Sequence, residues 1–389
     1  MSELTSRERV MKALNHEEAD RVPIDIGGIY NLTTLHRDAY TRLMDYLGYD
    51  YDEVEIAYFN PQSVIVDERI RQRFKSDCYP VCVDGPADWE FELHEEDDGS
   101  AWYRDEFGIK WKTSGLYFDP VEPPLKDCTV EDIEGFDWPD PQDPSRIAGL
   151  KEEVKRLYEE TDYCLVLSGP LGGGIYLPCT WFIGYQEFFM KLIMDPDVVE
   201  ALLKKIVEFQ LGWWEMVLAE IGEYLQVVVL SDDLGTQEAP LMRPEMYREQ
   251  IKPYQKEVVS FIKSKADVKV VYHCDGAIYD FIPDMIDIGF DALNPVQVSA
   301  KGMDDTAKLK EEFGDEISFW GGACDSQGRL SKGTPEEIKE EVKKRINDLA
   351  PGGGLVLASI HNIQKDVPVE NIVAFYEALY EYGSTFYKE

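Results

Sequence analysis

The chain alternates between short apolar runs and helix-length segments from Pro144 onward, and this alternation limits the folds open to it. Six such runs begin at Cys164, Gln226, Val268, Ala292, Ile317 and Leu355. Continuous apolar runs are typical of strands buried on both faces, and strand–helix–strand connections place neighbouring strands parallel. With the N-terminal strands added, the pattern predicts a closed eight-stranded (β/α)8 (TIM) barrel. A doubly wound open sheet is the alternative fold.

The first 140 residues carry the opening barrel elements and an elaboration of them. Thr5 and Glu8 form the pattern of a capping box, and residues 22–26 are typical of a strand. Residues 89–93 and 101–111 alternate with period two around a turn-rich segment, which predicts an aromatic-rich β-hairpin insert. We interpret residues 1–140 as this N-terminal region and 141–389 as the main barrel portion of a single domain.

The composition excludes several classes of function. A formal net charge of −37 argues against nucleic acid and anionic membranes as partners, because both require clustered Lys and Arg. Seven scattered cysteines do not form a disulfide framework and favour a reducing compartment. The sequence has no signal-peptide pattern and no apolar stretch of membrane-spanning length. We therefore expect a cytoplasmic protein.

Polar, reactive side chains follow five of the late strands. The carboxyl ends of parallel barrel strands meet at one rim, so these side chains are expected to converge there. A catalytic rim explains five such strand ends in succession better than a solvated surface does. The candidates are Asp232 and Asp233, His273 to Asp275, Asn294 and Gln297, Cys324 and Asp325, and His361 and Asn362.

The tripeptide His273-Cys274-Asp275 is the strongest candidate for metal binding. Alternate residues of a strand share one side, so His273 and Asp275 are expected to face together and Cys274 away. We predict His273, Asp275 and Cys324 as zinc ligands with an open fourth position, and keep Cys274 as the alternative to Asp275. A carboxylate in place of a second thiolate makes zinc a harder Lewis acid, suited to an ether or alcohol oxygen.

Two other motifs give weaker indications of function. Gly172-Gly173-Gly174 lacks the Lys-Ser/Thr of a phosphate-binding loop, and we interpret these glycines as letting a flat ligand approach the backbone. The sequence has no Gly-x-Ser-x-Gly elbow, so acyl transfer has no support.

Several motifs together resemble those of the uroporphyrinogen decarboxylase superfamily, and more narrowly its cobamide-dependent methyltransferase branch. They are Thr5-Ser-Arg-Glu-Arg-Val-Met-Lys-Ala-Leu-Asn-His, Asp20-Arg-Val-Pro, Asp232-Asp-Leu-Gly-Thr-Gln, His273-Cys-Asp-Gly, Leu293-Asn-Pro-Val-Gln, Trp320-Gly-Gly-Ala-Cys-Asp-Ser-Gln and His361-Asn-Ile-Gln. The resemblance covers nearly the whole chain. It implies a β/α barrel with its active site on the rim described above.

The chain departs from the superfamily in two informative places. The decarboxylases carry an Arg-Gln-Ala-Gly-Arg segment for the substrate's carboxylates, but residues 22–30 here contain no arginine. The coenzyme M methyltransferases carry His-x-Cys and a later Cys as zinc ligands. Here Asp275 stands at the second position, and Cys324 matches the later Cys.

These departures favour the branch that demethylates methoxylated aromatics and passes the methyl group to the cob(I)alamin of a corrinoid protein. We expect Asp232, Asp233 or His361 to donate a proton or orient the substrate, and Asn294, Gln297, Asn362 and Gly172 to contact it. Zinc and a cobalamin carried by the partner protein are the implied cofactors, and a homodimer is the expected assembly. The alternatives are a methylcobamide:thiol methyltransferase of the coenzyme M type and a decarboxylase.

Overall fold

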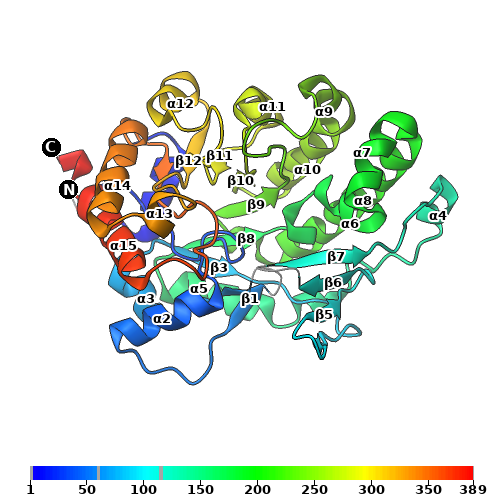
Figure 1. The fold of residues 1–389 in the computed structure, drawn as a ribbon, viewed down its shortest axis with the longest axis horizontal. Helices are drawn as coiled ribbons and strands as arrows, with labels where there is room; N and C mark the ends of the chain where they lie inside the picture. The colour runs from blue at the N-terminus through cyan, green and yellow to red at the C-terminus, as the bar shows by residue number, and fades with distance from the viewer. Residues whose placement is uncertain (1–2, 59–61, 114–116, 389) are drawn as a thin grey trace.

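Seven parallel strands form the wall of a barrel (Figure 1). The computed structural model describes residues 3–58, 62–113 and 117–388. The strands lie in the order β13-β12-β11-β10-β9-β8-β3, each hydrogen-bonded to the next. They are β3 (Cys78–Val81), β8 (Cys164–Ser168), β9 (Val227–Ser231), β10 (Lys269–His273), β11 (Ala292–Asn294), β12 (Ser318–Trp320) and β13 (Leu355–Val356).

Residues 22–26 close the barrel between β13 and β3. On one side, Asp25 N–H donates to Leu357 O over 2.8 Å and Leu357 N–H donates to Pro23 O over 2.9 Å. On the other side, Asp77 N–H donates to Ile24 O over 2.6 Å. Ile24 N–H donates to the Asp77 carboxylate (2.8 Å) instead of to a strand carbonyl, so this seam is not a regular ladder. The predicted TIM-barrel fold is confirmed.

Helices surround the strands, as Figure 1 shows. The longer ones are α2 (Arg37–Leu47), α5 (Leu150–Glu160), α7 (Tyr185–Met194), α8 (Pro196–Ile221), α10 (Lys252–Lys265), α14 (Pro335–Leu349) and α15 (Val369–Gly383). The shorter ones are α1 (Ser6–Leu14), α3 (Glu68–Phe74), α4 (Val130–Glu134), α6 (Leu177–Ile183), α9 (Pro244–Gln250), α11 (Ile282–Ile288), α12 (Thr306–Phe313) and α13 (Arg329–Lys332).

Helix α1 covers the amino-end opening of the barrel. Its Val10 and Leu14 belong to the same buried cluster as Val229, Val271 and Trp320, which line the barrel interior. The predicted capping box is present, because Thr5 accepts from Glu8 N–H and Glu8 accepts from Thr5 N–H. This end of the barrel is therefore filled by side chains, and the carboxyl end is left for a site.

The aromatic-rich insert is a four-stranded antiparallel sheet, not a single hairpin. It consists of β4 (His94–Glu95), β5 (Ala101–Arg104), β6 (Lys110–Thr113) and β7 (Phe118–Glu122); a separate pair, β1 (Ile56–Tyr58) and β2 (Ser63–Val64), precedes it. The predicted long strand 101–111 is divided because the Asp105 carboxylate accepts from Phe107 and Ile109 N–H and shapes a turn. The predicted strand 89–93 is not a strand: Trp89 N–H donates to Pro86 O in a turn, and Trp89 and Phe91 line a cavity.

None of the described helices is long and apolar enough to cross a membrane. All seven cysteines are free thiols.

Candidate functional site

Two histidines and an aspartate meet at the carboxyl end of the barrel. His273 is the last residue of β10, Asp275 follows it, and His361 lies in the loop after β13. Their potential ligand atoms all lie within 4.8 Å of one another. Nε2 of His273 is 3.8 Å from Oδ2 of Asp275, and Nε2 of His361 is 4.0 Å from the same oxygen.

Asn294 sets the tautomer of His273. Its Nδ2 donates to Trp320 O over 2.8 Å, which turns its Oδ1 toward Nδ1 of His273 at 2.6 Å. Nδ1 of His273 must therefore carry the proton in that contact, and the lone pair of Nε2 is left facing Asp275. A histidine that binds a metal needs this arrangement, with a fixed acceptor behind the ring.

Asp275 is held by its backbone, while its carboxylate is left free. Its N–H donates to Oδ1 of Asp233 over 3.0 Å. Its own Oδ1 is buried and has no hydrogen-bond partner among the described residues. A buried carboxylate oxygen without a partner is costly, so a proton or a cation is expected beside it.

Gly276 allows the sharp turn after Asp275. Its φ is +92°, and a Cβ there would lie 2.4 Å from the carbonyl carbon and oxygen of Gly235. Its N–H donates to Oε1 of Gln297 over 2.7 Å. The glycine thus lets two rim loops pack in direct backbone contact beside the cluster.

His361 completes the cluster from a strained position. Its φ is +59°, a region that side chains other than glycine rarely adopt. Its Nδ1 accepts from Asn362 N–H over 2.8 Å, which leaves the proton of the neutral ring on Nε2, toward Asp275. Burial lowers the pKa of His361, with Asp275 opposing and His273 adding to the shift. The neutral ring therefore presents an Nε2 proton toward Asp275; Nε2 becomes a ligand nitrogen when the proton moves to Nδ1 and the hydrogen bond from Asn362 N–H is given up.

The structure does not bring Cys324 into this group. Sγ of Cys324 lies 3.6 Å from Oε2 of Glu341 on α14, and burial raises the pKa of the Cys324 thiol. Cys274 is buried on the other side of the strand end, where its Sγ accepts from Leu234 N–H over 3.2 Å. Among the described residues, the cluster offers imidazole and carboxylate donors without a thiolate.

The two adjacent aspartates have different surroundings. Asp232 is fully buried, and its carboxylate accepts from the N–H groups of Ile175, Tyr176 and Leu177 and from the amide of Gln255. Burial raises the pKa of Asp232 to about 7, with these hydrogen bonds opposing the shift. Asp232 therefore holds the loop that leads into α6 and lines neither of the rim cavities described below, and its catalytic role stays a prediction. Asp233 adjoins the cluster, and burial followed by the charge of Asp275 raises its pKa.

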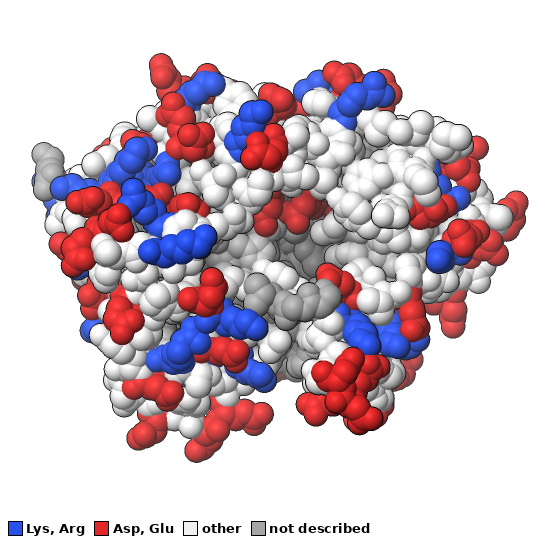
Figure 2. Space-filling model, in the orientation of Figure 1, with Lys and Arg blue, Asp and Glu red and all other residues white. Residues whose placement is uncertain are grey.

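A polar cavity of about 400 Å³ opens onto the cluster. Asp275, His361, Gln297 and Asn362 line it. Asn362 also joins loops, because its Nδ2 donates to Asn31 O over 2.8 Å. Tyr117, which the sequence reasoning did not place in the site, reaches this cavity from the insert and accepts from Gln364 Nε2 over 3.1 Å. Figure 2 shows acidic side chains inside the hollow at the centre of this face.

A second rim cavity of about 530 Å³ has aromatic walls. Gly172 lines it from the loop after β8; its φ is +65°, and a Cβ there would lie 3.5 Å from the Trp181 ring. The other walls come mainly from the insert. The aromatic residues are Tyr30, Trp89, Phe91, Tyr103, Phe107, Trp111 and Trp181. This shape and lining fit a flat, weakly polar group.

The donor set fits a divalent metal ion with an open coordination position. Three protein ligands are typical of catalytic zinc, and the free lone pair of His273 and the unpartnered Oδ1 of Asp275 are both available. His361 is geometrically able to be the third ligand.

Fold and cluster together define a TIM-barrel protein with a candidate metal centre on its carboxyl-end rim. A model of the family described as "Uroporphyrinogen decarboxylase (URO-D)" matches residues 115–382. The chain belongs to this family.

Its relatives include members with different activities. A "Uroporphyrinogen decarboxylase" from Alkalilimnicola ehrlichii is 26% identical over 71% of this chain and 73% of its own length. A "Methylcobamide:CoM methyltransferase MtaA" from Methanosarcina barkeri is 27% identical over 61% of this chain and 65% of its own length. A "methyltransferase from Methanosarcina mazei" has the same fold, with a TM-score of 0.66 and 20% identity over 98% of this chain and 99% of its own. The predicted membership is thus confirmed, and a cobamide-dependent methyltransferase is among the relatives.

Proposed function

We propose that this protein transfers a methyl group from a methoxylated aromatic compound to the cob(I)alamin of a corrinoid protein, with zinc bound at the rim. The observation that carries the proposal is the cluster of His273, Asp275 and His361, in which a carboxylate oxygen is buried without a partner. The methyltransferase among the relatives supports the reaction class. The nitrogen and oxygen ligands of the cluster support an ether as the methyl donor.

Nitrogen and oxygen donors leave zinc a hard Lewis acid, which stabilises charge on an ether oxygen. An aryl methyl ether leaves as a phenolate, whose conjugate acid has a pKa of about 10. The methyl carbon forms a bond to Co(I), the carbon–oxygen bond breaks, and its electron pair stays on the phenolate. The cobalt supplies both electrons of the new bond, so no further oxidant or reductant is required.

Residues of this chain are proposed to position the metal ligand and the substrate and to protonate the leaving group. Asn294 holds the His273 ring with Nε2 toward Asp275. Asp233, beside Asp275, is the group we propose to deliver a proton to the departing phenolate oxygen. The aromatic walls, including Trp111 and Trp181, are proposed to stack on the substrate ring.

The two rim cavities oppose a polycarboxylate substrate. Among the described residues that line them, Lys332 is the single cation, and it is exposed. A tetrapyrrole with many carboxylates requires arginine or lysine at the site. This lining favours a substrate with little negative charge over the polycarboxylate substrate of a decarboxylase.

An exposed apolar surface adjoins the aromatic cavity and supports a protein partner. Along α7, Tyr185, Met190, Ile193 and Met194 are 50%, 55%, 67% and 81% exposed. Figure 2 shows few charges where α7 lies in Figure 1, although the chain carries a net charge of −37. Helix α6 precedes α7 and carries Trp181 into the cavity wall. We propose that the corrinoid protein docks on α7, since a partner bound there would cover that cavity.

The test is a methyl-transfer assay with purified zinc-loaded protein, a cob(I)alamin carrier protein and a methoxybenzoate. Conversion of cob(I)alamin to methylcobalamin is followed by absorbance. We expect transfer with wild type and with Cys274→Ser, and loss with His273→Ala. Methylation from methanol or a methylamine in place of the aryl ether would refute the substrate class. No transfer with any donor would refute the reaction.

A second candidate is transfer of a methyl group from methylcobalamin to a thiol, and the relationship to the coenzyme M methyltransferase favours it. The absence of a thiolate from the described cluster opposes it, because soft ligands keep a zinc-bound thiolate reactive. Methylcobalamin and coenzyme M in the same assay decide between the two directions.

A further inference from the structure

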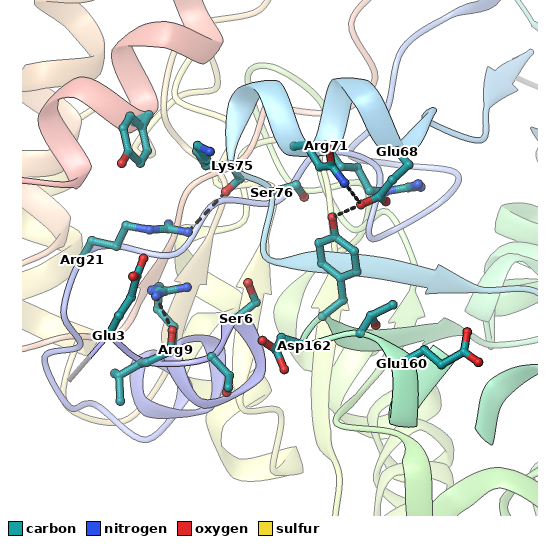
Figure 3. Close-up of a pocket in the computed structure, with 16 residues that line it drawn as sticks. Glu3, Ser6, Arg9, Arg21, Glu68, Arg71, Lys75, Ser76, Glu160 and Asp162 are labelled. Carbon is teal, nitrogen blue, oxygen red and sulfur yellow. Dashed lines mark hydrogen bonds between the residues drawn. The ribbon is translucent and has the colours of Figure 1, made fainter. Parts of the chain in front are cut away.

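A further cavity lies at the amino end of the barrel, opposite the candidate metal cluster. Its volume is about 750 Å³. The start of α1, the end of α3 and the segment leading into β8 line it (Figure 3). Polar side chains from three separated parts of the chain therefore face one space that the proposed methyl transfer does not use.

Arg71 of α3 is the exceptional residue of this cavity. It is only 1% exposed, and its Nε and Nη2 have no hydrogen-bond partner in the part of the chain that the structure describes. Its guanidinium lies 4.2 Å from the centre of the Tyr79 ring, which packs its face but satisfies no N–H group. A buried guanidinium with free donors is normally paired with a carboxylate or phosphate.

The other two arginines of the cavity are already neutralised. Arg9 pairs with Asp20 and Asp77 at 2.6 and 2.7 Å. Arg21 donates to both oxygens of Asp77, and Figure 3 shows its contact with the backbone oxygen of Lys75. Arg71 differs from them because no carboxylate among the described residues reaches it.

One nearby side chain adds positive potential. Lys75 follows Arg71 by one helical turn, lines the same cavity and belongs to none of the ion pairs of the described chain.

The acidic side chains of the cavity lie toward water. Glu3, Glu68, Glu160 and Asp162 are all exposed, whereas Arg71 is buried. Glu68 is also engaged, since its Oε1 accepts from Tyr163 and Gln72. Water screens the exposed carboxylates, but it screens the buried guanidinium much less. The acidic rim would repel a large polyanion and leaves room for one small anionic group.

We propose that this cavity binds a small molecule or ion through one carboxylate or phosphate group, with Arg71 as the principal contact and Lys75 as an auxiliary one. The anion would accept from the free guanidinium N–H groups. The site is separate from the metal cluster, so its occupancy is independent of which methyl donor the rim accepts.

The experiment measures thermal stabilisation of the full chain by inorganic phosphate and by acetate, each against chloride at equal ionic strength. Wild type is compared with Arg71→Met and with Arg73→Met. Arg73 is the matched control, because it lies on the same helix but pairs with Glu377 instead of lining the cavity. We expect Arg71→Met to weaken anion binding at least about tenfold, from the loss of charge-assisted hydrogen bonds, and Arg73→Met to leave it unchanged.

Stabilisation by phosphate alone identifies a phosphate site, and stabilisation by acetate identifies a carboxylate site. If neither anion exceeds chloride, or if both variants respond like wild type, the proposal is overturned. Should Arg71→Met fail to fold, Lys75→Met replaces it, since Lys75 is exposed and its loss should weaken binding several-fold. Equal binding by Lys75→Met and Arg73→Met would then refute the site.

Discussion

Replacing Asn294 tests whether this residue positions His273 or contacts substrate. Asn294 is fully buried, and its side chain makes two hydrogen bonds, one to Nδ1 of His273 (2.6 Å) and one to Trp320 O (2.8 Å). Asn294→Ala leaves both partners buried and unsatisfied. Asn294→Asp keeps an acceptor for His273 but places a second oxygen against the Trp320 carbonyl. The two variants therefore separate the contact to the histidine from the contact to the backbone.

The size of each effect follows from these contacts. Each buried group left without a partner costs roughly 1–3 kcal/mol, so Asn294→Ala should lose about 3 kcal/mol of unfolding free energy. With an unfolding entropy of about 2.1 cal/mol/K per residue, a chain of 389 residues should melt about 4 °C lower. Zinc affinity should fall about 10–100-fold in Asn294→Ala, because the ring is free to place its proton on Nε2. Asn294→Asp should lose stability but keep most of its zinc affinity.

Zinc affinity is measured by competition with a chromogenic chelator, and stability by thermal unfolding of the metal-free protein. The methyl-transfer assay supplies the KM for the aromatic substrate. Unchanged zinc affinity in Asn294→Ala, together with a raised KM, would show that Asn294 contacts substrate and would refute the positioning role.

The remaining predictions concern the ligand set, the insert and the partner surface. Asp275→Asn should reduce zinc occupancy and turnover, whereas Cys274→Ser and Cys324→Ser should keep about one zinc ion per chain, as measured by elemental analysis. Loss of zinc in Cys324→Ser would instead support Cys324 as a ligand, as the motifs predict. Burial raises the pKa of Asp105 to about 6, above the usual value of 3.8, so the folded state binds this proton more tightly than the unfolded state. Asp105 should therefore contribute stability at pH 4 that is lost as the pH rises to about 6. Over that range, the melting temperature of Asp105→Asn should improve relative to that of wild type. A difference in melting temperature that does not depend on pH would contradict this. Ile193→Asp on α7 should raise the KM for the corrinoid protein with little change in the KM for the aromatic substrate, and an unchanged KM for the carrier would exclude α7 from the docking surface.

The barrel was predictable because its signal is repeated along the chain. Apolar runs indicate the strands, and strand alternation predicts His273 and Asp275 on one side. In the structure, Nε2 of His273 lies 3.8 Å from Oδ2 of Asp275. The position of Cys324 was not predictable in the same way. Gly321 and Gly322, with φ of +121° and +67°, precede it, and such a turn redirects the following side chains without leaving a periodic pattern.

Roles that depend on three-dimensional partners were equally hidden. Asp232 and Asp233 are adjacent in the sequence, but one is enclosed by the backbone of residues 175–177 and the other adjoins the cluster. Tyr117 reaches the cavity from the insert, whose placement depends on packing between distant segments.

The seam that closes the barrel also sets the order in which the chain can fold. Ile24 pairs with Leu357, so the first barrel segment has no partner on that side until nearly the whole chain has been synthesised. Until then the nascent sheet has two unprotected edges, at residues 22–26 and at its most recently made strand. Pairing between such distant segments makes barrel closure a late and slow step. The ion pairs of Asp77 with Arg9 and Arg21, which all lie in the first fifth of the chain, are available to hold one edge of the gap in shape before the last strand arrives.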